Sequence, residues 1–69
     1  MNAAPDRRKD SLLRIRQVKA RTGLSTATIY RREDAGTFPR RERIGARCVA
    51  WYESDIDAFV AAPAAYKAA

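Results

Sequence analysis

The sequence predicts a small, mainly α-helical domain with one β-hairpin, and three observations lead to this fold class. Two short helical segments meet at a glycine, which is followed two residues later by Ser25, a good first residue for a helix. Two strand-like segments then flank Gly45 in a hairpin pattern. A last amphipathic segment ends before Pro63. Two helices joined by a tight turn and followed by a hairpin describe a winged helix-turn-helix domain.

The first half of the chain supplies the helix-turn-helix. Leu12 to Ile15 is predicted as a short edge strand, and 16–22 as a helix whose Val18 faces inward. Gly23 ends that helix, because glycine readily adopts the left-handed conformation found after helix ends. Ser25 is expected to cap a second helix over 26–35, which Gly36 ends and in which Ile29 points into the core.

The second half supplies the hairpin and a closing helix. Phe38-Pro39 is predicted as an extended link, because proline disfavours helix in itself and in the residue before it. Strands are expected over 41–45 and 47–51, with a corner at Gly45-Ala46 and with Val49 and Trp51 on one face. Ser54 is predicted to cap a helix that runs to Ala62 and faces inward through Ile56, Phe59 and Val60.

These elements divide the chain into three parts. Residues 1–11 are polar and charged, carry no apolar periodicity and are predicted to form a disordered basic tail. Residues 12–62 are predicted to form the winged helix-turn-helix domain. Residues 63–69 follow a helix-stopping proline and are predicted to be a flexible C-terminal tail.

The charge of the chain indicates a polyanionic partner. Its 69 residues carry a net charge of +6, and 11 of the 14 basic residues are arginine. The charge is skewed, because only Lys67 is basic after Trp51, against three acidic residues, Glu53, Asp55 and Asp57. Arginine presents a planar fork of donors that suits phosphates and guanine edges. The first two thirds of the chain are therefore expected to attract an anionic partner.

The same composition excludes several classes of function. There is no histidine and a single cysteine, Cys48, so neither a zinc site nor an internal disulfide can form. Without histidine no serine can belong to a hydrolase triad, and we predict no enzyme activity, no catalytic residue, no metal and no cofactor. No apolar run is long enough to span a membrane, and the N-terminus lacks the apolar stretch of a secretory signal, which predicts a cytoplasmic protein at the nucleoid.

Within this fold the candidate partner is double-stranded DNA. The second helix would lie in the major groove and the hairpin, or wing, would reach the flanking groove, where arginine is favoured. Tyr30 is ambiguous between packing and a phosphate contact, and the latter is slightly preferred. The predicted DNA-binding residues carry hydroxyl or guanidinium groups and lie at the second helix, on the wing, or in the segment that leads into the wing. They are Ser25, Thr26, Thr28, Tyr30, Arg31, Arg32, Arg40, Arg41, Arg43 and Arg47.

The order and spacing of short motifs resemble one known family. The matching pieces are Gly23-Leu24-Ser25, Thr28-Ile29-Tyr30-Arg31, Gly36, Phe38-Pro39, Ile44-Gly45 and the run from Trp51 to Phe59. Together they resemble the AlpA family of small phage and prophage regulators, related in fold to MerR-like and excisionase winged helices. The resemblance implies that Thr26, Thr28, Tyr30 and Arg31 contact DNA from the recognition helix, with Arg43 and Arg47 on the wing. It departs at Arg32 and Glu33, where family members often carry aliphatic residues.

The resemblance leaves two related functions open. One is a sequence-specific transcriptional regulator of prophage or mobile-element genes, with an integrase or RNA polymerase as a further partner. The other is an excisionase that bends DNA and assists an integrase. Either protein is expected to act as a homodimer or a cooperative oligomer on DNA, because one module reads few base pairs. A protein-interaction module or a cationic membrane-surface peptide ranks lower, because few large apolar residues are unplaced and glycines interrupt the helical pattern.

Overall fold

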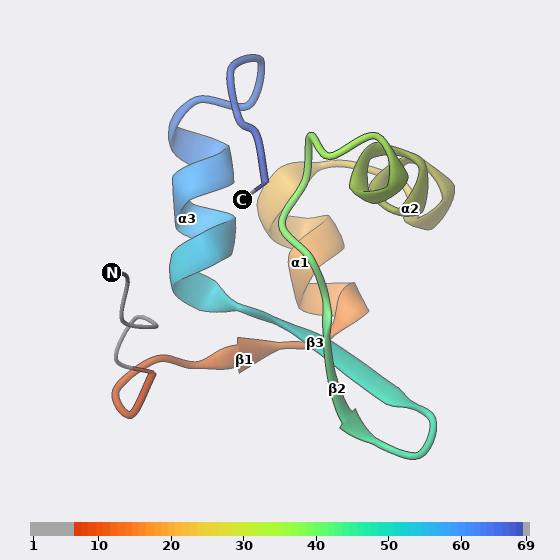
Figure 1. Ribbon diagram of the computed structural model, residues 1–69, viewed down its shortest axis with the longest axis vertical. Helices are drawn as coiled ribbons and strands as arrows, with labels where there is room; N and C mark the ends of the chain where they lie inside the picture. Colours follow the sequence, from red (N-terminus) through yellow and green to blue (C-terminus); the bar gives the residue numbers. More distant parts are fainter. Residues whose placement is uncertain (1–6, 69) are drawn as a thin grey trace.

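A computed structural model describes residues 7–68 as three helices and a small antiparallel sheet (Figure 1). The elements in chain order are β1 (Leu12–Leu13), α1 (Ile15–Thr22), α2 (Thr26–Asp34), β2 (Glu42–Gly45), β3 (Cys48–Tyr52) and α3 (Glu53–Ala61). The strand order is β1-β3-β2, so the hairpin is extended at its base by the strand that precedes the first helix. The predicted winged helix-like fold class is therefore confirmed.

The helix-turn-helix forms within one residue of its predicted bounds, and Ile15, predicted to end the edge strand, begins α1 instead. Gly23 has a φ of 74°, and its N–H donates to the carbonyl oxygen of Lys19 at 2.8 Å, which closes the end of α1. The Ser25 hydroxyl accepts a hydrogen bond of 3.2 Å from the N–H of Thr28 and caps α2. The left-handed conformation at Gly23 lets the chain reverse within three residues, so α2 can cross in front of the core.

The wing is the β2–β3 hairpin, which projects away from the helices in Figure 1. Arg43 pairs with Val49 and Gly45 pairs with Cys48, with an irregularity in the register between them. At its base β3 also pairs with β1, where Leu13 lies opposite Trp51. The wing is thus continuous with the core at one end and free at the other.

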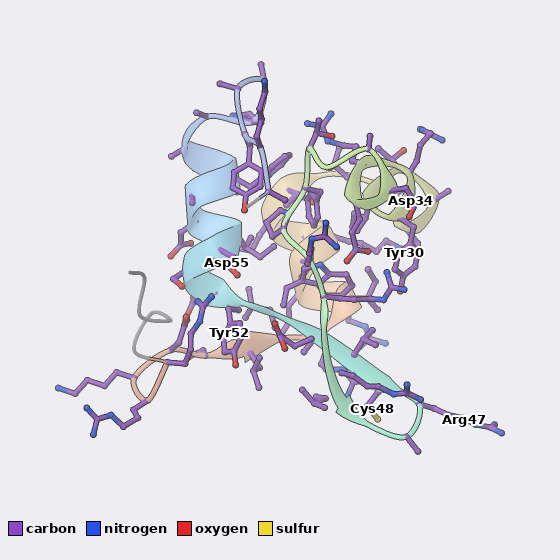
Figure 2. All side chains as sticks on the ribbon, viewed as in Figure 1. Tyr30, Asp34, Arg47, Cys48, Tyr52 and Asp55 are labelled. Atoms are coloured by element: carbon purple, nitrogen blue, oxygen red, sulfur yellow. The ribbon has the colours of Figure 1, made fainter. Side chains whose placement is uncertain are left out.

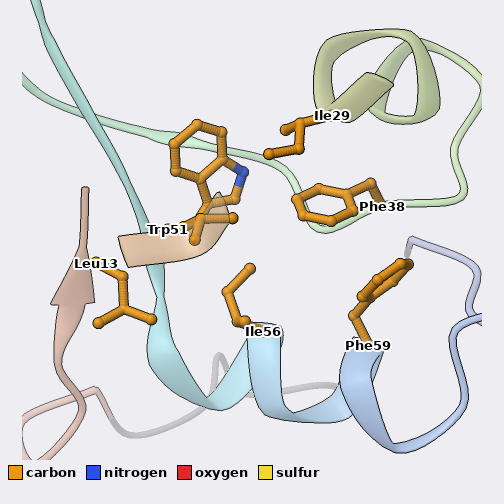
Figure 3. Close-up of a cluster of buried hydrophobic side chains, with 7 residues drawn as sticks. Leu13, Ile29, Phe38, Trp51, Ile56 and Phe59 are labelled. Carbon is orange, nitrogen blue, oxygen red and sulfur yellow. The ribbon is translucent and has the colours of Figure 1, made fainter. Parts of the chain in front are cut away.

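One cluster of buried side chains joins the three helices with β1 and β3, while β2 is exposed and contributes no buried residue (Figure 3). Its largest members are Trp51 and Phe38, both fully buried, and the Trp51 indole N–H donates to the carbonyl oxygen of Pro39 at 3.1 Å. The Phe38 and Phe59 rings lie 4.7 Å apart between centroids. The remaining buried members of the cluster are Leu13, Val18, Ile29 and Ile56.

The structure corrects two expectations for the last helix. Ser54 is not its cap, because α3 begins at Glu53 with Tyr52 as the capping residue, two residues before the predicted cap. The Ser54 hydroxyl donates instead to Asp10 at 2.6 Å. Val60 does not face the core and is 41% exposed, because Ile56 and Phe59 already fill the side of α3 that meets the cluster.

The two segments predicted as tails contact the domain where the structure describes them. Asp10 accepts a hydrogen bond of 3.2 Å from the N–H of Ser54, and the N–H of Glu53 donates to the Ser11 carbonyl oxygen at 2.7 Å. At the other end the Tyr66 ring lies 5.8 Å from that of Phe59, and the N–H of Ala68 donates to the Gly36 carbonyl oxygen. The prediction for residues 1–6 lies outside the described residues.

Candidate nucleic-acid interface

The exposed start of α2 carries a chain of hydrogen-bonding side chains. The Ser25 hydroxyl donates to the Thr28 hydroxyl at 3.0 Å, and the Arg31 guanidinium donates to the same hydroxyl at 3.1 Å. The three residues recur at a spacing of three, so they share one face of the helix. Thr26 begins α2 in a half-buried position. This face presents hydroxyl and guanidinium groups of the kind that bind phosphates and base edges.

The wing and α2 enclose a hollow of about 760 Å³. Arg40, Arg41, Arg43 and Arg47 line one side of it, and Tyr30, Glu33 and Asp34 line the other. Figure 2 shows Tyr30 and Asp34 on the part of α2 nearest the wing, with Arg47 reaching outward from the wing tip. The hollow therefore combines four guanidinium groups with two carboxylates, and it is not uniformly basic.

The arginines of the wing and its approach have different partners. Arg43 donates to the carbonyl oxygen of Ala46 at 3.1 Å and braces the turn of the wing. Arg41 forms an ion pair with Glu33 and lies over the Tyr30 ring, 4.9 Å from its centroid. Arg40 and Arg47 are exposed and have no ion pair within residues 7–68. Arg40 and Arg47 are thus the two whose guanidinium groups are available for an incoming anion.

Arg32 lies apart from the other predicted residues. It donates to the carbonyl oxygen of Pro63 at 3.0 Å, and its guanidinium is 5.2 Å from the centroid of the Phe59 ring. Its Nε is buried, and no described residue bonds to it. Arg32 therefore points toward α3 and the C-terminal segment rather than toward the hollow, and the structure does not group it with Arg31.

Two basic residues from the first third of the chain are paired with α3. Arg21 of α1 forms ion pairs with Asp57 and, at 3.7 Å, with Glu53. Arg7 lies over the Tyr52 ring at 4.0 Å and reaches Asp55 at 3.3 Å. These contacts raise the pKa of both guanidinium groups, mainly through hydrogen bonds to Asp57 and Asp10 respectively. The acidic last helix thus neutralises part of the basic N-terminal segment. The remaining positive charge of the domain therefore comes to a larger extent from the arginines on α2 and the wing.

Glu33 is not among the DNA-binding residues that the sequence predicts, yet it lies at the centre of this surface. Its side chain is only 9% exposed and binds Arg41 twice. The sequence held one signal for this position: Glu33 stands where members of the AlpA family often carry an aliphatic residue. An acidic side chain with so little exposure needs a charged or hydrogen-bonding partner, and Arg41, itself exposed, supplies it.

Neither metal nor membrane features accompany this surface. Residues 7–68 contain no group of three or more histidine, cysteine or acidic side chains placed to hold a metal ion. In the same part of the chain no helix has the length and apolar character needed to cross a membrane. Cys48 is a half-buried free thiol at the edge of the hollow.

The helix-turn-helix, the wing and the arginine-lined hollow together define a small winged helix-like domain. The family model described as "Prophage CP4-57 regulatory protein (AlpA)" matches residues 11–63, which include every helix and strand. The chain belongs to this AlpA family of prophage regulatory DNA-binding proteins, which is not an enzyme family.

The chain is also similar to a phage protein. The chain is 37% identical over 57 residues to "Uncharacterized protein ORF88" of Enterobacteria phage P4. The match covers 83% of this chain and 65% of that protein, so the chain spans less than two thirds of the relative's length. No solved structure gives a significant match.

Proposed function

We propose that the protein is a sequence-specific regulator of prophage or mobile-element genes that binds double-stranded DNA through α2 and the wing. The observation that carries this proposal is the shared face of Ser25, Thr28 and Arg31 on a capped helix, in a domain whose wing carries the exposed Arg47. A helix of this size fits the major groove, and its first turns bring side chains to base edges. The protein would work in the cytoplasm at the bacterial nucleoid.

The two elements have different roles in this proposal. Arg31 and Thr28 read base edges or hold phosphates from α2, and Thr26 supports them from the first turn. Arg47 and Arg43 lie on the wing, where arginine favours the negative potential of a flanking minor groove. Arg40 adds a phosphate contact between the two elements. Arg32 is removed from the proposed contact set because its guanidinium is engaged by Pro63 and Phe59.

The test compares the affinity for the protein's own upstream region with that for random DNA of equal length. A regulator binds its own region at least about a thousandfold more tightly at a fixed salt concentration. With about 5 to 7 phosphate contacts the log-log salt slope lies between roughly −4 and −6. Equal affinity for both DNAs would overturn the specific-regulator proposal.

The second candidate is an excisionase that uses the same residues. The small size of the domain fits this function as well as it fits a regulator, since 62 described residues present few side chains to DNA and need further copies along the site. A gel-shift assay with circularly permuted sites separates the two functions. A pronounced bend with stepwise, cooperative complexes supports the excisionase, and one unbent complex supports the regulator. An integrase or RNA polymerase as partner is a further proposal, testable by co-purification with the DNA-bound protein.

A further inference from the structure

Glu33 binds the chain at the point where it enters the wing. One carboxylate oxygen accepts the backbone N–H of Arg41 at 2.7 Å, and the other accepts the Arg41 guanidinium. Arg41 immediately precedes β2, which begins at Glu42. One side chain of α2 thus holds both the main chain and the side chain of the residue at the base of the wing.

Aromatic contacts continue this attachment into the core. The Arg41 guanidinium lies over the Tyr30 ring, and the Tyr30 ring lies 6.3 Å from that of Trp51 between centroids. Trp51 is fully buried in β3, the second strand of the wing. Tyr30 and Glu33 are three residues apart on α2, so they share the side of the helix that faces the wing.

The attachment matters because α2 has little other support on this side. The backbones of the elements pack most closely where β3 meets β1, β2, α1 and α3 and where α1 meets α3 and β1. Helix α2 belongs to none of these pairs. Ile29 is the one residue of α2 that is fully buried. The angle between α2 and the wing therefore depends on side-chain contacts.

We propose that Glu33, with Arg41 and Tyr30, is a positioning residue that sets the angle between the recognition helix and the wing. We name these three residues the wing anchor. The inference rests on the proposed DNA binding for its consequence, because the helix and wing must meet two grooves at a set separation. Arg41 acts in it through Glu33 and is not itself a phosphate contact.

If Glu33 positions the wing, its removal changes DNA affinity in the direction opposite to that expected from charge alone. Removing an acidic group from a DNA-binding surface ordinarily strengthens binding, because phosphate repulsion is lost. Glu33→Ala is expected to weaken binding to the upstream site by about tenfold, because the wing loses its fixed angle. The matched control is Asp34→Ala, which removes the same charge from the next residue of α2, where the described chain shows no ion pair. This control is expected to bind as well as the parent protein or more tightly.

Double substitution then separates positioning from phosphate contact. If Arg41 acts through Glu33, Arg41→Ala lowers affinity about as much as Glu33→Ala, and the double variant is no weaker than either. If Arg41 binds a phosphate directly, its loss reduces the salt slope by about 1, as loss of Arg40 would, and adds to the effect of Glu33→Ala. Additive effects, or tighter binding by Glu33→Ala, would overturn the inference.

A measurement without DNA keeps the inference separate from the proposed function. Residual dipolar couplings of backbone amides report the orientation of β2–β3 relative to α2 in the free protein. Glu33→Ala is expected to reduce the wing's couplings while those within α2 and β1 persist, and Asp34→Ala is expected to leave both unchanged. Unchanged wing couplings in a folded Glu33→Ala protein would refute the anchor, whatever the DNA assays show. Glu33→Gln, which keeps the acceptor for the Arg41 N–H, serves if the alanine variant does not fold.

Discussion

The indole N–H of Trp51 donates a hydrogen bond of 3.1 Å to the carbonyl oxygen of Pro39, so the central strand is joined to the link between α2 and the wing. Both residues are fully buried, and neither group can exchange this partner for water. The bond explains why an extended link of two apolar residues, Phe38 and Pro39, passes through the core rather than over the surface.

Removing that bond is expected to be costly for a domain of this size. Trp51→Phe leaves the Pro39 carbonyl unpaired and is expected to lower the free energy of unfolding by about 1–3 kcal/mol. Trp51→Ala adds a cavity and is expected to cost about 3–5 kcal/mol. Chemical denaturation followed by circular dichroism measures both values. Equal stability of Trp51→Phe and the parent protein would show that the bond contributes nothing.

Adjacent arginines on α2 are expected to behave differently. Arg31→Ala should weaken specific DNA binding by about 1–3 kcal/mol with little change in melting temperature, because Arg31 is exposed and its bond within residues 7–68 is to its neighbour Thr28. Arg32→Ala should instead lower the free energy of unfolding by about 1 kcal/mol, because it loses the Pro63 carbonyl and the Phe59 ring. Binding titrations and thermal melts of both variants check the pair, and a specific affinity loss for Arg32→Ala would return it to the contact surface.

Arg47 at the wing tip is expected to contribute a phosphate or minor-groove contact. Arg47→Ala should reduce the magnitude of the log-log salt slope by about 1 and weaken binding to all sequences similarly. Lys67 provides the matched control, because it is exposed in the C-terminal segment, away from the hollow that α2 and the wing enclose. An equal change of slope for Lys67→Ala would mean that the effect is one of net charge alone.

Replacement of Gly23 by a residue with a side chain is expected to strain the backbone and lower the free energy of unfolding. Its φ of 74° is unfavourable for residues with a side chain, although an added Cβ would meet no atom within 4 Å. Gly23→Ala should therefore lower the free energy of unfolding by about 1 kcal/mol through strain, and Gly23→Asn by less. A denaturation series of the two variants measures the difference. If alanine cost no more than asparagine, left-handed strain would not be the cause.

Asp10 makes the stability of the protein depend on acid pH. Hydrogen bonds led by the one from the Ser54 hydroxyl lower the pKa of Asp10 from 3.8 to about 2. Because the folded pKa lies below the unfolded one, the charged form stabilises the fold above pH 4, and this contribution is lost as the pH falls from about 4 to about 2. Melting temperatures of the parent and Asp10→Asn should differ at pH 7 and converge at pH 2. A difference that persists at pH 2 would assign the effect to shape rather than charge.

The sequence by itself determined the order of the elements and most of the core. Periodicity identified Val18, Ile29, Ile56 and Phe59 as inward-facing, and local chemistry predicted the Gly23 turn and the Ser25 cap, which both form. These features depend on residues within four positions of one another, so local rules reach them. The same rules failed at Val60 and Ser54, where neighbours far along the chain decide what is covered and what is capped.

Tertiary structure alone decided which arginines are available. In the sequence these side chains look alike, because each is an arginine near a turn or the hairpin: Arg31, Arg32, Arg40, Arg41 and Arg47. In the fold, Arg32 contacts Pro63, Arg41 contacts Glu33, and Arg47 faces solvent. Arginine side chains are long and find partners far along the chain: Arg32 bonds to Pro63, 31 residues away, and Arg7 bonds to Asp55, 48 residues away. Local pattern predicts that such a side chain is polar and exposed, but its partner depends on which elements the fold brings beside it.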